Sequence, residues 1–250
     1  MTRVLITGAS AGLGAEYARQ LAARGDDLVL VARDGGRLEA LAGDLHGVEV
    51  EVLPADLLDP EQIARVEERL RDPEKPVDML INNAGYGMGL AFERNDVEDE
   101  VKHLRLHNEV PLRLSHAALP GMLARGHGRI VNIASVAAFT PRSTYGACKR
   151  WLVDISRWMS GEYGTRGVTA TAVCPGYTHT EFHARLGLPP GQEGIPGWMW
   201  LDAPDVIAES LRDIDRGKAL SVPSRRYKAI VALLKVVPAG VAARASARGR

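Results

Sequence analysis

Near the start of the chain, the segment Arg3-Val-Leu-Ile-Thr-Gly-Ala-Ser-Ala-Gly-Leu-Gly14 carries the clearest signal of the fold. Its first half, residues 3–7, is apolar and β-rich and predicts a buried strand. Its second half carries glycines at positions 8, 12 and 14 and leads into a helical pattern over residues 12–24. A plain turn would explain one glycine, whereas three let the backbone approach a pyrophosphate at a helix N-terminus. The stretch therefore predicts a nucleotide-binding α/β fold.

Short β-rich runs alternate with longer runs of helical period along the rest of the chain. This alternation is typical of βαβ units, whose right-handed crossovers give a parallel sheet covered on both faces. We expect one α/β domain built on a Rossmann-type, doubly wound parallel sheet of about seven strands. The expected strands span residues 3–7, 27–32, 48–54, 77–81, 129–134, 168–174 and 219–222, and the expected helices span residues 12–24, 34–45, 60–71, 96–125, 144–164 and 203–216.

Composition narrows the class of protein. Of the 250 residues, 46% are hydrophobic and 25% charged, which is typical of a globular domain with a full-sized core. Basic and acidic residues both total 31, so we expect no overall field that attracts nucleic acid. Cys148 and Cys174 are too few for a disulfide framework and predict a reducing, cytoplasmic setting. We also expect no secretory leader and no transmembrane segment.

Two segments depart from the alternation. Residues 176–204 are rich in glycine, proline and tryptophan and follow the sixth strand, so we expect a substrate loop there, within a catalytic domain over residues 1–223. Residues 224–250 carry seven basic and no acidic side chains and predict a basic tail with a helix over 225–236. That helix either packs against the substrate loop or a neighbouring subunit, or lies on an anionic membrane surface. We favour packing because Pro238 cuts the helix short.

The end of the second strand predicts which dinucleotide binds. An NAD site places Asp or Glu there for the ribose 2′-hydroxyl, whereas this chain has Ala32 and Arg33. A guanidinium cannot accept that hydrogen bond but can bind a 2′-phosphate, so the residues favour NADP(H). The alternative is that Arg33 is a solvated charge. Arg37, one helical turn later, is either a second phosphate contact or a surface charge.

Four polar side chains follow in an order that suits proton transfer. Tyr145 and Lys149 are four residues apart in a predicted helix, so the phenol and the ammonium share one face. A nearby positive charge favours phenolate and lowers the pKa of a phenol towards the working pH. Ser135 closes the fifth strand and can donate to a substrate oxygen, and Asn108 lies on the preceding long helix. Together, behind a glycine-rich turn, they indicate an enzyme.

From residue 3 to about residue 222 the chain resembles the short-chain dehydrogenase/reductase family, through its TGxxxGxG turn, its Asn-Asn-Ala-Gly segment at 82–85 and its Pro-Gly pair at 175–176. The resemblance implies that Tyr145 is the general acid/base and that Ser135 binds the substrate oxygen. It implies that Lys149 holds the nicotinamide ribose and that Asn108 holds a relay water. Together with Arg33, the cofactor residues are then Gly8, Ser10, Gly12, Leu13, Gly14, Asp56, Asn82, Ala84, Gly85, Tyr145, Lys149, Pro175, Gly176, Thr178 and Thr180.

Other features have plainer interpretations. The link from Ser135 to Tyr145 is about three residues shorter than the family usually has, which we expect to affect substrate shape rather than catalysis. The pairs His103/His107 and His179/His183 have the spacing of helical metal ligands but lack an obvious third ligand, so we expect no metal site. Trp198-Met-Trp200 is either an apolar substrate wall or core.

The expected function is that of an NADP(H)-dependent oxidoreductase that interconverts a ketone or aldehyde and its alcohol, on a hydrophobic substrate. One alternative is an oxidative alcohol or hydroxysteroid-type dehydrogenase, and another is a non-catalytic dinucleotide-binding sensor or scaffold. The complete Asn, Ser, Tyr and Lys set argues against a sensor. The resemblance also implies a homodimer or homotetramer. The apolar face with Leu152, Ile155 and Met159 would form that interface or pack on the sheet.

Overall fold

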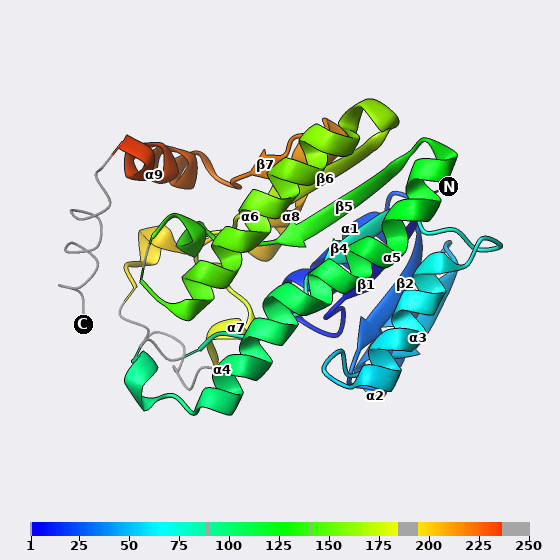
Figure 1. The fold of residues 1–250 in the computed structure, drawn as a ribbon, viewed down its shortest axis with the longest axis horizontal. Helices are drawn as coiled ribbons and strands as arrows, with labels where there is room; N and C mark the ends of the chain where they lie inside the picture. The colour runs from blue at the N-terminus through cyan, green and yellow to red at the C-terminus, as the bar shows by residue number, and fades with distance from the viewer. Residues whose placement is uncertain (1, 89–90, 141, 185–194, 237–250) are drawn as a thin grey trace.

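The computed structural model describes residues 2–88, 91–140, 142–184 and 195–236. It has a central sheet with helices on both faces, shown in Figure 1. Seven parallel strands lie in the order β3-β2-β1-β4-β5-β6-β7, so the chain reverses its direction of winding between β1 and β4. This confirms the doubly wound α/β fold. The strands are β1 (Arg3–Thr7), β2 (Asp27–Ala32), β3 (Val50–Pro54), β4 (Met79–Asn82), β5 (Gly128–Ile133), β6 (Val168–Val173) and β7 (Leu220–Ser221).

Several helices begin at a residue whose side chain caps them. Asp34, Asp59 and Asp96 accept backbone N–H groups at the starts of α2, α3 and α4, which satisfies donors that a helix cannot pair internally. The helices are α1 (Gly12–Ala22), α2 (Gly35–Asp44), α3 (Pro60–Arg71), α4 (Val97–Leu104), α5 (Val110–Arg125), α6 (Thr144–Tyr163), α7 (Glu181–Ala184), α8 (Ala203–Asp215) and α9 (Arg225–Val236), with short turns η1 (Phe92–Arg94), η2 (Arg105–Glu109), η3 (Val136–Phe139), η4 (Gly164–Arg166) and η5 (Gly197–Met199).

The core forms two apolar layers, one on each face of the sheet. Val4 and Ile6 belong to the layer that includes residues of α1 and α8, while Leu5 between them belongs to the layer that includes α3 and α5. Successive strand residues point to opposite faces, so this apolar run is buried on both sides. Leu152 and Met159 of α6 are buried in these layers, which means that the chain's own core covers them.

The expected helix over 96–125 differs from what the structure contains. It consists of α4 and α5 joined by η2, a π-helical segment over Arg105–Glu109. A π turn holds an extra residue, so it shifts the side chains that follow relative to a regular helix. Asn108 lies in this turn. Hydrophobic period alone cannot reveal such an insertion.

The expected tail helix is present as α9 and packs against the rest of the chain. Tyr227 and Val231 are 2% and 3% exposed and belong to the same apolar layer as α1 and α8. Residues 237–250 lie outside the described residues. No helix in the described part is both long and apolar enough to cross a membrane.

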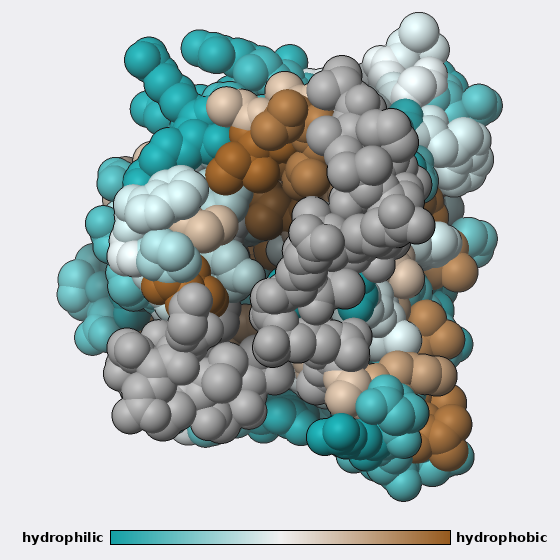
Figure 2. Space-filling model, turned by 90° about the vertical axis from the view of Figure 1, so that its left-hand side faces the viewer, coloured by the Kyte–Doolittle hydropathy of each residue, from teal (hydrophilic) through white to brown (hydrophobic). Residues whose placement is uncertain are grey.

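The carboxyl ends of the strands point towards the side on which α4, α7 and α9 lie in Figure 1. Figure 2 looks onto this side and shows apolar side chains, in brown, gathered around a hollow. In an open parallel sheet this is the edge where ligands bind, next to the reversal of strand order between β1 and β4.

Candidate active site

One hydroxyl ties the glycine turn after β1 to the end of β4. Thr7 Oγ1 accepts the backbone N–H groups of Asn83 and Ala84 at 2.9 and 3.1 Å, and it donates to the Ile81 carbonyl oxygen at 3.3 Å. The Asn83 amide in return donates to the carbonyl oxygens of Thr7 and Gly8. The turn and the Asn-Asn-Ala-Gly segment are therefore held together at adjacent strand ends.

The glycine turn has the shape that close approach of an anion requires. Gly8 and Gly12 have φ values of +65° and +55°, in the left-handed region. A Cβ on Gly14 would lie 2.3 Å from the Gly8 carbonyl oxygen, so a larger residue cannot fit. Within the described residues no side chain caps the start of α1, which leaves its N–H groups available to a pyrophosphate. Ser10 is partly exposed in the turn, whereas Leu13 packs against the core.

Arg33 lies at the end of β2, exposed and without an ion pair among the described residues. The nearby residues Asp34 and Arg37, in contrast, already have hydrogen-bond or ion-pair partners. Asp34 Oδ1 accepts the Arg37 N–H at 3.0 Å, and the Arg37 guanidinium contacts Asp34 at 3.6 Å and Glu181 at 3.2 Å. Arg33 is thus placed to meet an added anion, while Arg37 already links α2 to the start of α7.

Asp56 follows β3 at the same edge of the sheet as Arg33. Its carboxylate accepts the Leu58 N–H at 3.0 Å, and its own N–H donates to Gln62 Oε1 at 2.8 Å. The preceding Ala55 N–H donates to the Ala32 carbonyl oxygen at 2.9 Å. These bonds fix the turn that carries Asp56 beside the end of β2.

The side chain of Asn82 is buried and forms hydrogen bonds within the protein. Asn82 is 4% exposed, and its Nδ2 donates to Asn132 Oδ1 at 2.9 Å and to Ser115 Oγ at 3.3 Å. Asn132 donates in turn to Ser156 Oγ at 2.9 Å, and Ser156 donates to the Leu152 carbonyl oxygen at 2.7 Å. This buried polar chain joins β4 and β5 to α6. Asn82 therefore aligns α6 with the sheet.

Ser135, Tyr145 and Lys149 come together at the end of β5. Ser135 Oγ accepts the Ala137 N–H at 3.1 Å, and the Ser135 side chain hydrogen-bonds to Tyr145. Lys149 Nζ lies 5.5 Å from the centroid of the Tyr145 ring and donates to the Ile133 carbonyl oxygen at 2.6 Å. The first turn of α6 thus places phenol and ammonium together, as their four-residue spacing predicts.

Burial shifts the pKa of both groups towards their neutral forms, because a low dielectric disfavours charge. It raises the pKa of Tyr145 well above 10.0, against the opposing effect of the hydrogen bond with Ser135, so the lowered phenol pKa predicted from the sequence is wrong for the protein without bound cofactor. It lowers the pKa of Lys149 from 10.5 to about 8, and this side chain is only 4% exposed. Tyr145 is therefore a protonated phenol able to donate, and Lys149 still carries its charge at neutral pH.

Asn108 reaches the same place from the π turn. Its Nδ2 donates to the Cys148 carbonyl oxygen at 3.2 Å, while its Oδ1 is buried and lacks a hydrogen-bond partner among the described residues. A buried acceptor of this kind calls for an ordered water. The position is consistent with the water-holding role that the family resemblance implies.

The sequence predictions missed a cluster of rings around Tyr145. The ring centroids of His107, His103 and Phe182 lie 5.7, 6.0 and 6.0 Å from that of Tyr145. Tyr86 packs edge-on against both histidines. Among the described residues no group of three or more possible ligands could hold a metal ion. The histidines are instead part of the wall behind the phenol.

His107 also fixes the backbone after β4. Its Nε2 lies 3.2 Å from the Tyr86 nitrogen and 2.8 Å from the Tyr86 carbonyl oxygen, and a Cβ on Gly85 would lie 2.4 Å from its ring. Burial and the charge of Lys149 hold the pKa of His107 well below 6.5 and lower the pKa of His103 to about 4. Both imidazoles are therefore neutral near pH 7. Their four-residue spacing, with His107 directly before Asn108, is the signal that could have identified them.

The segment after β6 approaches the glycine turn. Thr178 Oγ1 donates to the Gly176 carbonyl oxygen at 3.0 Å, so the turn after Pro175 is braced by its own side chain. A Cβ on Gly12 would lie 3.5 Å from Thr180 Cβ, which puts Thr180 beside the start of α1. The first and last cofactor segments expected from the sequence are therefore adjacent in space.

The described part of the expected substrate loop is held by aromatic side chains. The His179 and Trp200 rings stack, with centroids 4.7 Å apart and planes 13° apart. Trp198 is 58% exposed, so it is not core, whereas Met199 packs against the core. The side chain of His183 and all of residues 185–194 lie outside the described residues.

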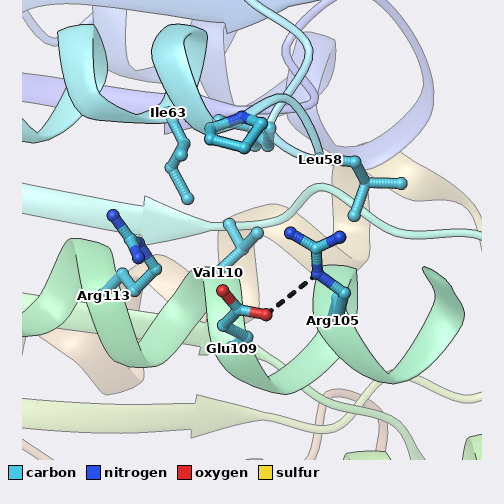
Figure 3. A pocket seen from close by; sticks show the side chains of 8 residues that line it. Leu58, Ile63, Arg105, Glu109, Val110 and Arg113 are labelled. Atoms are coloured by element: carbon cyan, nitrogen blue, oxygen red, sulfur yellow. Dashed lines mark hydrogen bonds and ion pairs between the residues drawn. The ribbon is translucent and has the colours of Figure 1, made fainter. Parts of the chain in front are cut away.

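A small pocket of about 90 Å³ lies beside α3 and η2, and Figure 3 shows its lining. Arg105 and Glu109 face each other across 3.0 Å at its edge, and Arg113 pairs with Glu67 at 2.6 Å. Both cations are already paired, and none of the residues proposed for catalysis lines the pocket. It does not belong to the site described above.

Comparison with known proteins agrees with this geometry. The family profile described as short chain dehydrogenase matches residues 2–189. Oxidoreductase UcpA of Escherichia coli strain K12 is 32% identical over 201 residues, covering 76% of this chain and 76% of that protein.

Two solved structures are similar over nearly the whole chain. A short-chain dehydrogenase from Sphingobium yanoikuyae, in complex with NADPH, is 36% identical with a TM-score of 0.85, and the match covers 95% of this chain and 97% of that one. The bulky-bulky ketone specific alcohol dehydrogenase from Comamonas testosteroni is 32% identical with a TM-score of 0.80, covering 95% of each chain.

Proposed function

This chain belongs to the short chain dehydrogenase family, and from that membership we propose that it is an NADP(H)-dependent oxidoreductase that interconverts a hydrophobic ketone or aldehyde and its alcohol. The observation that carries the proposal is the convergence of Ser135, Tyr145 and Lys149 at the carboxyl end of β5. A sensor or scaffold would not need a buried phenol beside a buried ammonium.

The residues at the strand ends fit a dinucleotide. The start of α1, where the N-cap residue Ala11 makes no side-chain cap, and the left-handed glycines suit a pyrophosphate. The guanidinium of Arg33, which has no ion pair among the described residues, suits a 2′-phosphate. A similar protein binds NADPH, which supports the same choice here. Lys149 would bind the nicotinamide ribose, and the Pro175–Thr180 segment would bind the carboxamide.

When bound, the reduced nicotinamide supplies a hydride to the carbonyl carbon. The chain's own residues act on the carbonyl oxygen of the substrate. The Ser135 hydroxyl would donate a hydrogen bond to the carbonyl oxygen as negative charge develops on it. The Tyr145 hydroxyl would give its proton to that oxygen, which completes the alcohol, and the Lys149 ammonium would stabilise the phenolate left behind. A water on Asn108 Oδ1 would return the proton from solvent.

Several neighbours of the phenol support a hydrophobic substrate. Phe182 and the two neutral histidines surround the Tyr145 ring, and Trp198 is exposed on the substrate loop. The Comamonas testosteroni protein is described as specific for bulky-bulky ketones, which points the same way. We propose that residues 176–204 form the substrate loop. We also propose that the protein acts in the cytoplasm, where the buried thiols of Cys148 and Cys174 would stay reduced.

The direct test is a panel of quinones, steroids, acyl ketones and aliphatic aldehydes, followed by loss of NADPH absorbance. The proposal expects turnover of at least one bulky apolar carbonyl compound. An oxidative role on a secondary alcohol uses the same residues in reverse. The same panel run with the product alcohols and NADP⁺ compares the two directions.

A further inference from the structure

The segment that follows β6 and the turn at η5 are joined by a short parallel bridge. The Leu201 N–H donates to the Tyr177 carbonyl oxygen, and the His179 N–H donates to the Leu201 carbonyl oxygen, both at 2.9 Å. In a parallel ladder the next bond towards the N-terminus would run from the Tyr177 N–H to the Met199 carbonyl oxygen. In this structure a side chain takes the place of that direct bond and joins the two backbone groups.

The hydroxyl of Tyr227, from α9, stands in its place. The Tyr177 N–H donates to the Tyr227 hydroxyl oxygen at 3.1 Å, and the hydroxyl donates to the Met199 carbonyl oxygen at 2.8 Å. One side chain thus satisfies a backbone donor and a backbone acceptor and extends the bridge by one link. Because both ends of the link are main-chain groups, it fixes the backbones rather than two mobile side chains.

The ring of Tyr227 is fitted as closely as its hydroxyl. Tyr227 is 2% exposed, and a Cβ on Gly176 would lie 2.1 Å from the ring. The glycine of the Pro-Gly pair therefore leaves space that the ring fills. Two further contacts hold α9 in register, from Lys228 to Glu209 of α8 and from Arg226 to the Trp198 carbonyl oxygen.

We propose that Tyr227 is a positioning residue for the active site, because it sets the distance between the proposed nicotinamide segment at Pro175–Thr180 and the proposed substrate wall at Gly197–Trp200. This inference rests on the proposed function of those segments. It assigns α9 to the site, although the sequence reads as a basic tail beyond the catalytic domain. Hydride transfer is sensitive to small misplacement of the two reactants, so loosening this link slows the reaction without removing a reacting group.

Tyr227→Phe is the sharpest variant, because it removes one oxygen and keeps the ring against Gly176. We expect kcat/KM for the best carbonyl compound of the panel to fall about tenfold, while the Kd for NADPH stays within about twofold, because the glycine turn and Arg33 are untouched. Tyr17→Phe is the matched control. It also loses a buried hydroxyl contact, of 2.7 Å to Ser210 Oγ between α1 and α8, so it lowers stability without affecting Gly176 or Met199.

Two readouts need no substrate and separate this inference from the proposed function. Hydrogen exchange should accelerate at the Tyr177 amide in Tyr227→Phe and not in Tyr17→Phe, because that amide loses its acceptor. The fluorescence of bound NADPH, which reports the surroundings of the nicotinamide, should also change in Tyr227→Phe and not in Tyr17→Phe. A second variant, Gly176→Ala, should reproduce both effects by displacing the ring.

Two results would overturn this inference. Unchanged exchange at Tyr177 would mean that the hydroxyl link does not hold the segment. Faster exchange with NADPH fluorescence and kcat/KM equal to those of Tyr17→Phe would mean that the link exists but does not position the site. If no carbonyl compound is turned over by the wild-type protein, the proposed function fails, and the exchange and fluorescence measurements still decide the role of Tyr227.

Discussion

Lys149 Nζ lies 5.5 Å from the centroid of the Tyr145 ring while its ammonium donates to the Ile133 carbonyl oxygen at 2.6 Å. The cation is therefore anchored to the end of β5 and faces the phenol from a fixed point. In Figure 1, α6 runs along β5 and β6, so the strand end and the first turns of the helix share this edge. The charge of one residue is thereby available to stabilise the phenolate of the other.

The pH dependence of carbonyl reduction should follow the protonation of Lys149. Its pKa is lowered to about 8, so the ammonium is lost as the pH rises through that value, while Tyr145, with its raised pKa, stays protonated. We expect kcat/KM for carbonyl reduction to fall above about pH 8. His103 should add no step between pH 5 and 8, because its pKa is lowered to about 4, and burial together with the charge of Lys149 holds the pKa of His107 well below 6.5.

Lys149→Arg tests the assignment of this step. A guanidinium stays charged throughout this range, so the variant should lose the decline even if its rate is lower. A decline at the same pH in Lys149→Arg would assign the step to another group.

Cofactor choice should depend on Arg33. We expect NADPH to bind more tightly than NADH by at least about 1.5–3 kcal/mol, the contribution of a charge-assisted contact, and Arg33→Ala to remove most of the difference. Titration of protein fluorescence with each cofactor measures it. Arg212→Ala, an exposed arginine on α8, is the control and should leave the preference intact. Equal affinities in the wild-type protein would contradict the assignment.

Thr7 should matter for stability more than its size suggests. Thr7 is 1% exposed, and its hydroxyl bonds to three backbone groups of the neighbouring strand end. Thr7→Val keeps the shape and removes these bonds, so we expect the free energy of unfolding to fall by about 1–3 kcal/mol. Urea denaturation measures this. A loss below about 0.5 kcal/mol would mean that the Asn83 amide alone holds the two segments together.

Assembly should involve the exposed face of α4. Val97, Val101 and Leu104 are 67%, 42% and 55% exposed and follow one another at helical spacing, which is typical of a contact surface. Light scattering should give two or four times the 27.0 kDa chain mass, and Val101→Lys with Leu104→Lys should shift it to the monomer. A monomer mass for the wild-type protein at micromolar concentration would rule this out.

Local sequence patterns predicted most of the elements. The strand expected over 27–32 and the tail helix expected over 225–236 have these same bounds in the structure, because apolar runs and helix-breaking residues are local signals. The π turn around Asn108 and the inward use of Asn82 were not predicted. Both features depend on how α5 and α6 pack on the sheet. The spacing of hydrophobic residues along the sequence does not contain that information.

The contacts of Tyr227 also could not be predicted from local sequence patterns. A tyrosine among arginines and a lysine reads as part of a solvated basic helix, yet it is 2% exposed and reaches the backbone 50 residues earlier in the chain. Only the missing Cβ of Gly176 reflects this contact in the sequence, and a glycine after proline is also common in ordinary turns.

The role of Tyr145 is tested by the turnover of Tyr145→Phe beside the wild-type protein, with NADPH and the best carbonyl compound of the panel. Only the proton-donating oxygen is lost, so we predict a fall in kcat of at least about a hundredfold, with a Kd for NADPH within about twofold of the wild-type value. Turnover by Tyr145→Phe at the wild-type rate would show that this phenol does not transfer the proton.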